Sequence, residues 1–133
     1  MAGYIGYIAS RPVGDTRAPQ HIQNMVIREY CRGKSLAFKL SATEYATPHC
    51  YMMLEKLVAD LPAHDGIVAY SMFMLPRRAE RRRALYETII SNGCALLAAV
   101  EDIRLETRDD VDRWEDILKV AYALDGRSTL LEA

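Results

Sequence analysis

Short apolar runs alternate along the chain with longer segments in which apolar residues recur at helical spacing. The strand-length runs lie at residues 3–9, 36–40, 67–70 and 95–100. Runs of this length, bounded by glycine, proline and polar residues, are typical of buried strands. The pattern predicts four strands, and the continuous apolar run at 67–70 is expected at the centre of the sheet.

An amphipathic segment follows each predicted strand. Apolar residues recur every three or four positions within residues 19–31, 53–61, 85–90 and 111–121. Thr47-Pro48 supplies an N-cap and a first-turn proline, which predicts that the second helix begins there. Thr107 and Asp110 resemble a capping box and predict the start of the last helix.

Strands and helices thus alternate four times with short connections. This alternation predicts a single doubly wound α/β domain, with a mainly parallel sheet of four or more strands and helices on both faces. A chain of 133 residues has room for one such domain, which we expect to span residues 1–133 with a tail at 126–133. In sheets of this kind, ligands bind beyond the carboxyl ends of the strands.

The composition, with 50% hydrophobic and 26% charged residues, is that of an ordinary globular protein. No apolar run approaches the roughly 20 residues that span a bilayer, and the first residues lack a signal-peptide pattern, so we expect a cytoplasmic protein without a membrane partner. A net charge of −1 argues against general affinity for nucleic acid. The three cysteines and three histidines lack metal-ligand spacing, so we expect no metal and no cofactor.

Polar side chains follow every predicted strand, and carboxyl ends of parallel strands meet at one edge of a sheet. A hydroxyl, a carboxylate and a guanidinium could therefore converge there to form a ligand pocket. The competing interpretation is that these loops are polar because they are hydrated and cap helices. The predicted substrate-binding residues are Arg11, Gln20, Asn24, Ser41, Thr43, Tyr45, Ser71 and Glu101.

Cys50 is the sharpest catalytic candidate, because it falls in the predicted first turn of the second helix. Helix N–H groups at that position favour a thiolate. A thiolate could attack a carbonyl or an activated sugar carbon while Glu44 or His21 transfers protons, and Ser10 is the alternative nucleophile. A buried structural cysteine is the competing interpretation.

Five arginines lie between Arg77 and Arg83, near the start of the third predicted helix. The helix dipole disfavours positive charge there unless an anion is close, so a phosphate or an acidic partner would explain the run. A solvated face relieved by Glu80 and Glu87 is the alternative.

Several strings of the sequence resemble the small family called sporadic carbohydrate cluster proteins, over about Tyr4 to Glu101. The strings are Ser10-Arg-Pro12, Arg17-Ala-Pro-Gln-His-Ile-Gln-Asn24, Leu40-Ser-Ala-Thr-Glu-Tyr-Ala46, Cys50-Tyr-Met-Met-Leu-Glu55 and Asp65-Gly-Ile-Val-Ala-Tyr-Ser-Met-Phe-Met-Leu-Pro76. Members of that family are encoded among surface-carbohydrate biosynthesis genes. The resemblance implies a role in making or modifying an unusual sugar, with a sugar or sugar phosphate as the ligand.

A fainter resemblance is to the catalytic domain of serine recombinases, which also opens with a Gly-Tyr strand that ends in a serine. Ser10 falls where that family has its nucleophile, and Arg77 matches one of its arginines. Phe73 and Met74 stand where an aspartate and another arginine belong, so the resemblance implies a resolvase- or flavodoxin-like fold without DNA strand transfer. It also implies a homo-oligomer, because that family pairs through helices.

Two functional hypotheses follow from these patterns. The first is a small enzyme of carbohydrate biosynthesis that uses Cys50 or Ser10 as nucleophile, Glu44 as acid or base, and Arg11 to bind a phosphate or carboxylate. The second is a non-catalytic assembly partner of a biosynthetic enzyme, in which the arginines from Arg77 to Arg83 dock an acidic surface.

Overall fold

A computed structural model describes residues 3–10, 12 and 18–124 of the chain, so the predicted tail at 126–133 and Arg11 lie outside the described residues. Strands and helices alternate over this length as predicted. The elements in chain order are β1 (Tyr4–Ala9), α1 (Gln20–Gly33), β2 (Phe38–Glu44), α2 (Met52–Ala59), β3 (Gly66–Ala69), the 3-10 turn η1 (Met72–Met74), α3 (Ala79–Ser91), β4 (Ala95–Ala98), β5 (Ile103–Leu105) and α4 (Arg108–Leu124).

The sheet has the strand order β2-β1-β3-β4-β5. The first four strands are parallel, and β5 runs antiparallel to β4. This arrangement is the predicted doubly wound, mainly parallel α/β fold, with the 67–70 run at its centre as β3. The chain order changes direction between β1 and β3, where folds of this type bind ligands outside the strand ends.

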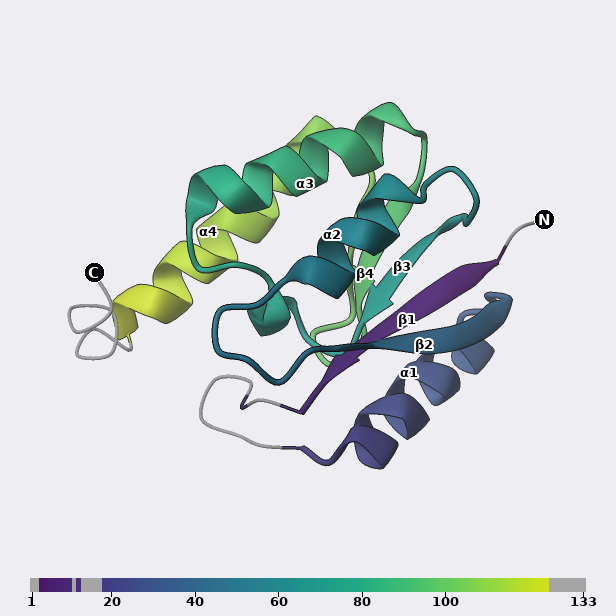
Figure 1. The fold of residues 1–133 in the computed structure, drawn as a ribbon. Coiled ribbons are helices and arrows are strands. Elements are labelled where there is room, and N and C mark those ends of the chain that lie inside the picture. The colour runs from purple at the N-terminus through teal and green to yellow at the C-terminus, as the bar shows by residue number, and fades with distance from the viewer. Residues whose placement is uncertain (1–2, 11, 13–17, 125–133) are drawn as a thin grey trace.

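Helices cover both faces of the sheet, as Figure 1 shows: α1 lies alone on one face, and α2, α3 and α4 cover the other. Alternate strand residues therefore enter two separate cores. Tyr7, Ile67 and Leu96 pack on the three-helix side, whereas Ile8, Val68 and Leu97 pack toward α1. Within the described chain, no helix has both the length and the apolar character needed to cross a membrane.

The second strand differs from its prediction, because it spans Phe38–Glu44 rather than residues 36–40. It is an edge strand with partly exposed side chains, so polar residues are tolerated along it and the apolar run does not mark its bounds. Ser41, Thr43 and Glu44 consequently lie within the strand and not in the loop after it.

Two further elements depart from expectation. The second helix begins at Met52 and not at Thr47-Pro48. Its first N–H groups are bound by a carboxylate from outside the helix, so the local cap that the sequence suggested is not used. The strand β5 was not predicted, because its three residues Ile103–Leu105 are too few to show a period.

Candidate functional site

The carboxylate of Glu44, at the carboxyl end of β2, is buried against the start of α2. Its Oε1 accepts hydrogen bonds from the Tyr7 hydroxyl at 2.8 Å and from the Leu54 N–H at 3.1 Å. Its Oε2 accepts from the backbone N–H groups of Met53 at 3.0 Å and Tyr45 at 3.1 Å. The protein thus places its own anion where a helix N-terminus attracts negative charge.

These contacts decide which protonation state Glu44 keeps. Burial by itself would raise its pKa, but the hydrogen bonds from Met53, Tyr7 and Leu54 outweigh burial and lower the pKa below its ordinary value. A carboxylate with a lowered pKa takes up a proton reluctantly, so Glu44 is a fixed anion and a weak general base.

Cys50 lies two residues before α2 and therefore outside its first turn, contrary to the expectation. Its Sγ lies 3.7 Å from Oε2 of Glu44, with the thiol as donor. The helix N–H groups that were expected to favour a thiolate are instead bound by Glu44. The helix-terminus argument for Cys50 therefore does not apply in this geometry, although the predicted pair of Cys50 and Glu44 is in contact.

A cationic pocket lies beside this pair, between two loops that both follow strands at their carboxyl ends. The segment before α2 and the segment before α3 form its walls, and its volume is about 270 Å³. Its lining residues are His49, Tyr51, Pro76, Arg77, Arg78 and Arg81.

Aromatic rings and one carboxylate orient the arginines of the cationic pocket. The guanidinium of Arg77 lies over the ring of Tyr122, 4.2 Å from its centroid. Arg81 lies over Tyr51 at 5.1 Å and forms a half-exposed ion pair with Glu55 at 3.1 Å. The two rings hold the guanidinium groups of Arg77 and Arg81 in place beside the same small volume.

A second pair of predicted residues, Ser71 and Glu101, meets at the carboxyl ends of β3 and β4. The Ser71 hydroxyl donates to Glu101 at 2.7 Å, and the Met72 N–H donates to the same carboxylate at 2.8 Å. Ser71 in turn accepts from the Phe73 N–H at 3.2 Å and so caps η1. These bonds give both residues a defined structural role.

The remaining predicted residues on α1 lie on the opposite side of the sheet from α2. Asn24 accepts a hydrogen bond of 2.6 Å from Ser41, and both face the α1 layer. Gln20 and His21 are exposed at the start of α1. The sheet therefore separates these residues from Cys50 and Glu44, which the sequence analysis placed in the same pocket.

A buried glutamine that the sequence analysis did not single out joins β1 to α1. Gln23 accepts from the Ala9 N–H at 3.0 Å and donates to the Ala9 carbonyl at 2.6 Å and the Ala18 carbonyl at 2.8 Å. These bonds fix the carboxyl end of β1 directly before Ser10, which is half-buried. A polar residue at an apolar helix position, between Ile22 and Val26, was the signal that could have marked it.

Thr43 and Tyr45 are exposed, and neither lines the cationic pocket. The lining residues His49, Tyr51 and Arg81 were not predicted from the sequence, although the arginine run is evident in it. Their convergence depends on α2 and α3 packing side by side, which no local pattern encodes.

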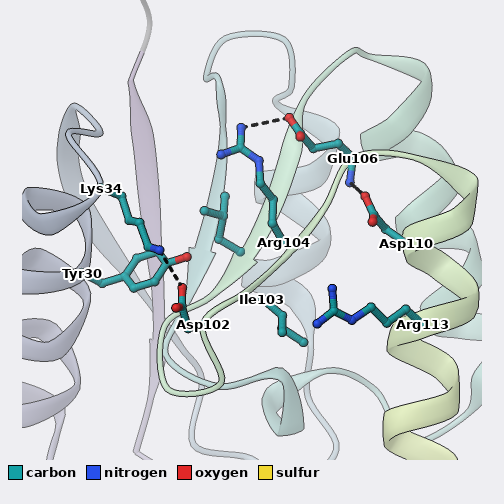
Figure 2. A pocket seen from close by; sticks show the side chains of 9 residues that line it. Tyr30, Lys34, Asp102, Ile103, Arg104, Glu106, Asp110 and Arg113 are labelled. Carbon is teal, nitrogen blue, oxygen red and sulfur yellow. Dashed lines mark hydrogen bonds and ion pairs between the residues drawn. The ribbon is translucent and has the colours of Figure 1, made fainter.

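A second hollow of about 360 Å³ lies over β4 and β5, on the face that α1 covers (Figure 2). Lys34 pairs with Asp102 at 3.1 Å, and Arg104 pairs with Glu106 at 2.9 Å. Asp110 accepts the Glu106 N–H at 2.8 Å. Lysine, arginine and carboxylate side chains thus alternate around this hollow, whereas the charged residues that line the cationic pocket are arginines.

Comparison with known proteins supports the fold. No protein-family model and no curated protein matches the sequence. The N-terminal catalytic domain of TP901-1 integrase has a similar structure, with a TM-score of 0.65 and 14% identity over 98% of this chain and 99% of that one. The fold is resolvase-like. A resolvase family site-specific recombinase from Streptococcus pneumoniae also has a TM-score of 0.65, at 7% identity over 97% of this chain and 95% of that chain.

At these identities the likeness shows the fold alone. It confirms the resolvase-like α/β architecture that the sequence analysis inferred from its fainter resemblance. The closer resemblance, to sporadic carbohydrate cluster proteins, stays a prediction.

Proposed function

We propose that this domain binds a small phosphorylated sugar in the cationic pocket and serves in carbohydrate biosynthesis. The observation that carries the proposal is the convergence of Arg77, Arg78 and Arg81 on one pocket at the carboxyl edge of the sheet. Guanidinium groups bind phosphate oxygens through paired hydrogen bonds. The sugar part of the proposal rests on the resemblance to sporadic carbohydrate cluster proteins.

The arrangement of the pocket favours an external anion. Glu44 already binds the first N–H groups of α2, so a ligand phosphate would be bound by side chains and not by that helix terminus. Arg78 is the most exposed of the three arginines, and its ion pair with the equally exposed Glu80 is long, at 4.0 Å. Its charge is therefore available to a ligand from solvent.

The size of the pocket narrows the ligand class. A volume of about 270 Å³ is at the small end of ligand pockets, which run to about 300–1,000 Å³. Such a volume suits a monosaccharide phosphate better than a nucleotide sugar. The ring of Tyr51, which lines the same pocket, offers an apolar face on which a sugar ring could pack.

Chemistry at the site would run through Cys50, because its chain neighbours His49 and Tyr51 both line the pocket. Glu44 is in reach of the thiol but is a weak base. The proposal therefore has a binding half, which the arginines carry, and an enzymatic half. Turnover of a bound sugar phosphate that is lost in Cys50→Ser, with unchanged phosphate affinity, would establish the enzymatic half.

The test is calorimetric titration of the protein with inorganic phosphate, glucose 1-phosphate and glucose at low salt. We expect the two phosphates to bind and glucose not to bind. Arg81→Gln should weaken phosphate binding about tenfold. The matched control is Arg83→Gln, an exposed arginine of α3 that does not line the pocket, and it should leave affinity unchanged.

Two results would reject the proposal: no binding of either phosphate, or equal losses in Arg81→Gln and Arg83→Gln. The second result would favour the assembly-partner hypothesis, in which the whole arginine face docks an acidic protein. The exposure of Arg78 and Arg83 is the observation that supports that hypothesis. This hypothesis predicts salt-sensitive binding to a biosynthetic enzyme. Replacing any one of these arginines should weaken that binding by a similar amount.

A further inference from the structure

A buried ion pair joins α3 to α4 directly behind the cationic pocket. Arg82 and Glu115 are 5% and 9% exposed, and they form two parallel bonds, from Nε at 2.8 Å and from Nη2 at 2.7 Å. The Tyr86 hydroxyl donates to the same carboxylate at 2.8 Å. Burial by itself would raise the pKa of Glu115, but Arg82 and Tyr86 outweigh burial and lower it, so the pair is ionised.

The third nitrogen of this arginine reaches the loop that carries the pocket. Nη1 of Arg82 donates to the carbonyl of Pro76 at 2.9 Å and to the carbonyl of Arg77 at 2.7 Å. Those carbonyls belong to the segment from Pro76 to Arg78, which forms one wall of the pocket. One buried guanidinium therefore connects α4, through Glu115, to the backbone of the anion-binding loop.

The helix α4 supports the same loop at a second point. Tyr122, two turns beyond Glu115, lies under the guanidinium of Arg77. By contrast, Arg81 is oriented by Glu55 of α2 and by Tyr51, directly before that helix. Arg77 and Arg81 thus have separate supports.

We propose that Arg82 and Glu115 are positioning residues that set the conformation of the Pro76–Arg78 loop and thereby the anion affinity of the pocket. The affinity part rests on the proposed function, whereas the positioning part does not. The guanidinium fork is planar, so its two bonds to Glu115 fix the direction of Nη1. A change at Glu115 is therefore transmitted to the loop without any contact between Glu115 and the ligand.

The principal variant removes the connection while sparing the fold. Removing one partner would leave a buried charge, which costs far more than replacing the whole pair by apolar side chains of similar volume. The triple variant Arg82→Met, Tyr86→Phe, Glu115→Leu removes both charges and the Tyr86 hydroxyl that donates to the carboxylate. We expect it to retain the packing of α3 on α4, because the side-chain volumes are similar, and it lacks the two bonds to the loop carbonyls.

The first readout needs no ligand: the side-chain Nε–Hε NMR signals of Arg77, Arg78 and Arg81. In the triple variant we expect the Arg77 and Arg78 signals to move and the Arg81 signal to stay. The second readout is affinity for inorganic phosphate, which should fall roughly tenfold.

Two controls separate positioning from a general loss of stability. Glu87→Gln breaks the exposed ion pair between Glu87 and Arg108, which also joins α3 to α4 but does not touch the loop. Leu118→Ala removes a fully buried side chain of α4 and lowers the melting temperature. Both should leave the loop signals and the phosphate affinity at wild-type values.

Unchanged Arg77 and Arg78 signals in the folded triple variant would overturn the proposal. The same changes in Leu118→Ala would also overturn it, because the pair would then act only through stability. If the wild-type protein binds no phosphate, the proposed function fails, and the ligand-free signals still decide whether Arg82 positions the loop.

Discussion

Replacing Glu44 by glutamine removes a charge that the Cys50 thiol and four closer donors surround. The Tyr7 hydroxyl and three backbone N–H groups lie between 2.8 and 3.1 Å from the two carboxylate oxygens. In Glu44→Gln one oxygen becomes an NH₂ group, which faces two of these donors with hydrogens of its own. Hydrogen bonds to a charged group contribute about 1.5–3 kcal/mol each, so losing two costs about 3 kcal/mol or more of unfolding free energy.

That loss corresponds to a fall in melting temperature of roughly 10 °C for a domain of this size. Urea unfolding followed by far-UV circular dichroism at pH 7 measures the free energy directly. The matched control is Glu55→Gln, on the helix α2 whose first N–H groups Glu44 binds. Glu55 forms a half-exposed ion pair with Arg81, and its loss should cost less than about 1 kcal/mol.

The pH dependence gives a second, independent check. Against the opposing effect of burial, hydrogen bonds lower the folded-state pKa of Glu44 below its ordinary value of 4.5, so the unfolded chain takes up this proton first as pH falls. The stability from Glu44 is thus complete at neutral pH and is lost below about pH 4.5. The difference between wild type and Glu44→Gln should narrow there. A cost under about 1 kcal/mol at pH 7, or a difference that does not change down to pH 3, would refute this account of Glu44.

Two further variants, each with a matched control, test the close packing at Gly66 and the hydrogen bonds from Gln23 to β1. Gly66→Ala should destabilise the domain by several kcal/mol in urea unfolding, because the added Cβ would lie 2.2 Å from a backbone oxygen of β4. The control Gly33→Ala should be neutral or slightly stabilising, because its Cβ would have nothing within 4 Å. Gln23→Ala should cost about 2–3 kcal/mol by the same measurement, because it leaves buried backbone groups of β1 without partners, and the exposed Gln20→Ala should cost under about 0.5 kcal/mol. Equal stabilities within either pair would contradict the contacts described.

The architecture was predictable where the signal is local. Alternating apolar runs and amphipathic segments marked four of the five strands and all four helices, and the capping box before α4 is present. Oδ2 of Asp110 accepts from the N–H groups of Glu106 and Thr107 at 2.8 and 3.1 Å, and Thr107 accepts from the Asp110 N–H at 3.3 Å. The start of α2 was mispredicted because its cap comes from β2, through a side chain eight residues before the helix.

The candidate site was less predictable than the fold. The rule that ligands bind at strand carboxyl ends led to the edge where the cationic pocket lies, and the predicted neighbours Cys50 and Glu44 are in contact there. The same rule does not indicate which side of the sheet a given polar residue faces, because the side depends on strand register. The bulge between Tyr4 and Gly6 shifts that register along β2, and Ser41 consequently faces α1.

The turn between β4 and β5 joins two layers of the molecule through adjacent residues. Glu101 binds η1 in the three-helix layer, while Asp102, at a φ of +53°, pairs with Lys34, directly after α1. An exposed turn between antiparallel strands is normally a good place to insert an epitope tag or to open the chain for circular permutation. Here an insertion would move these two side chains apart, so protein engineers should choose another loop for labels and fusions.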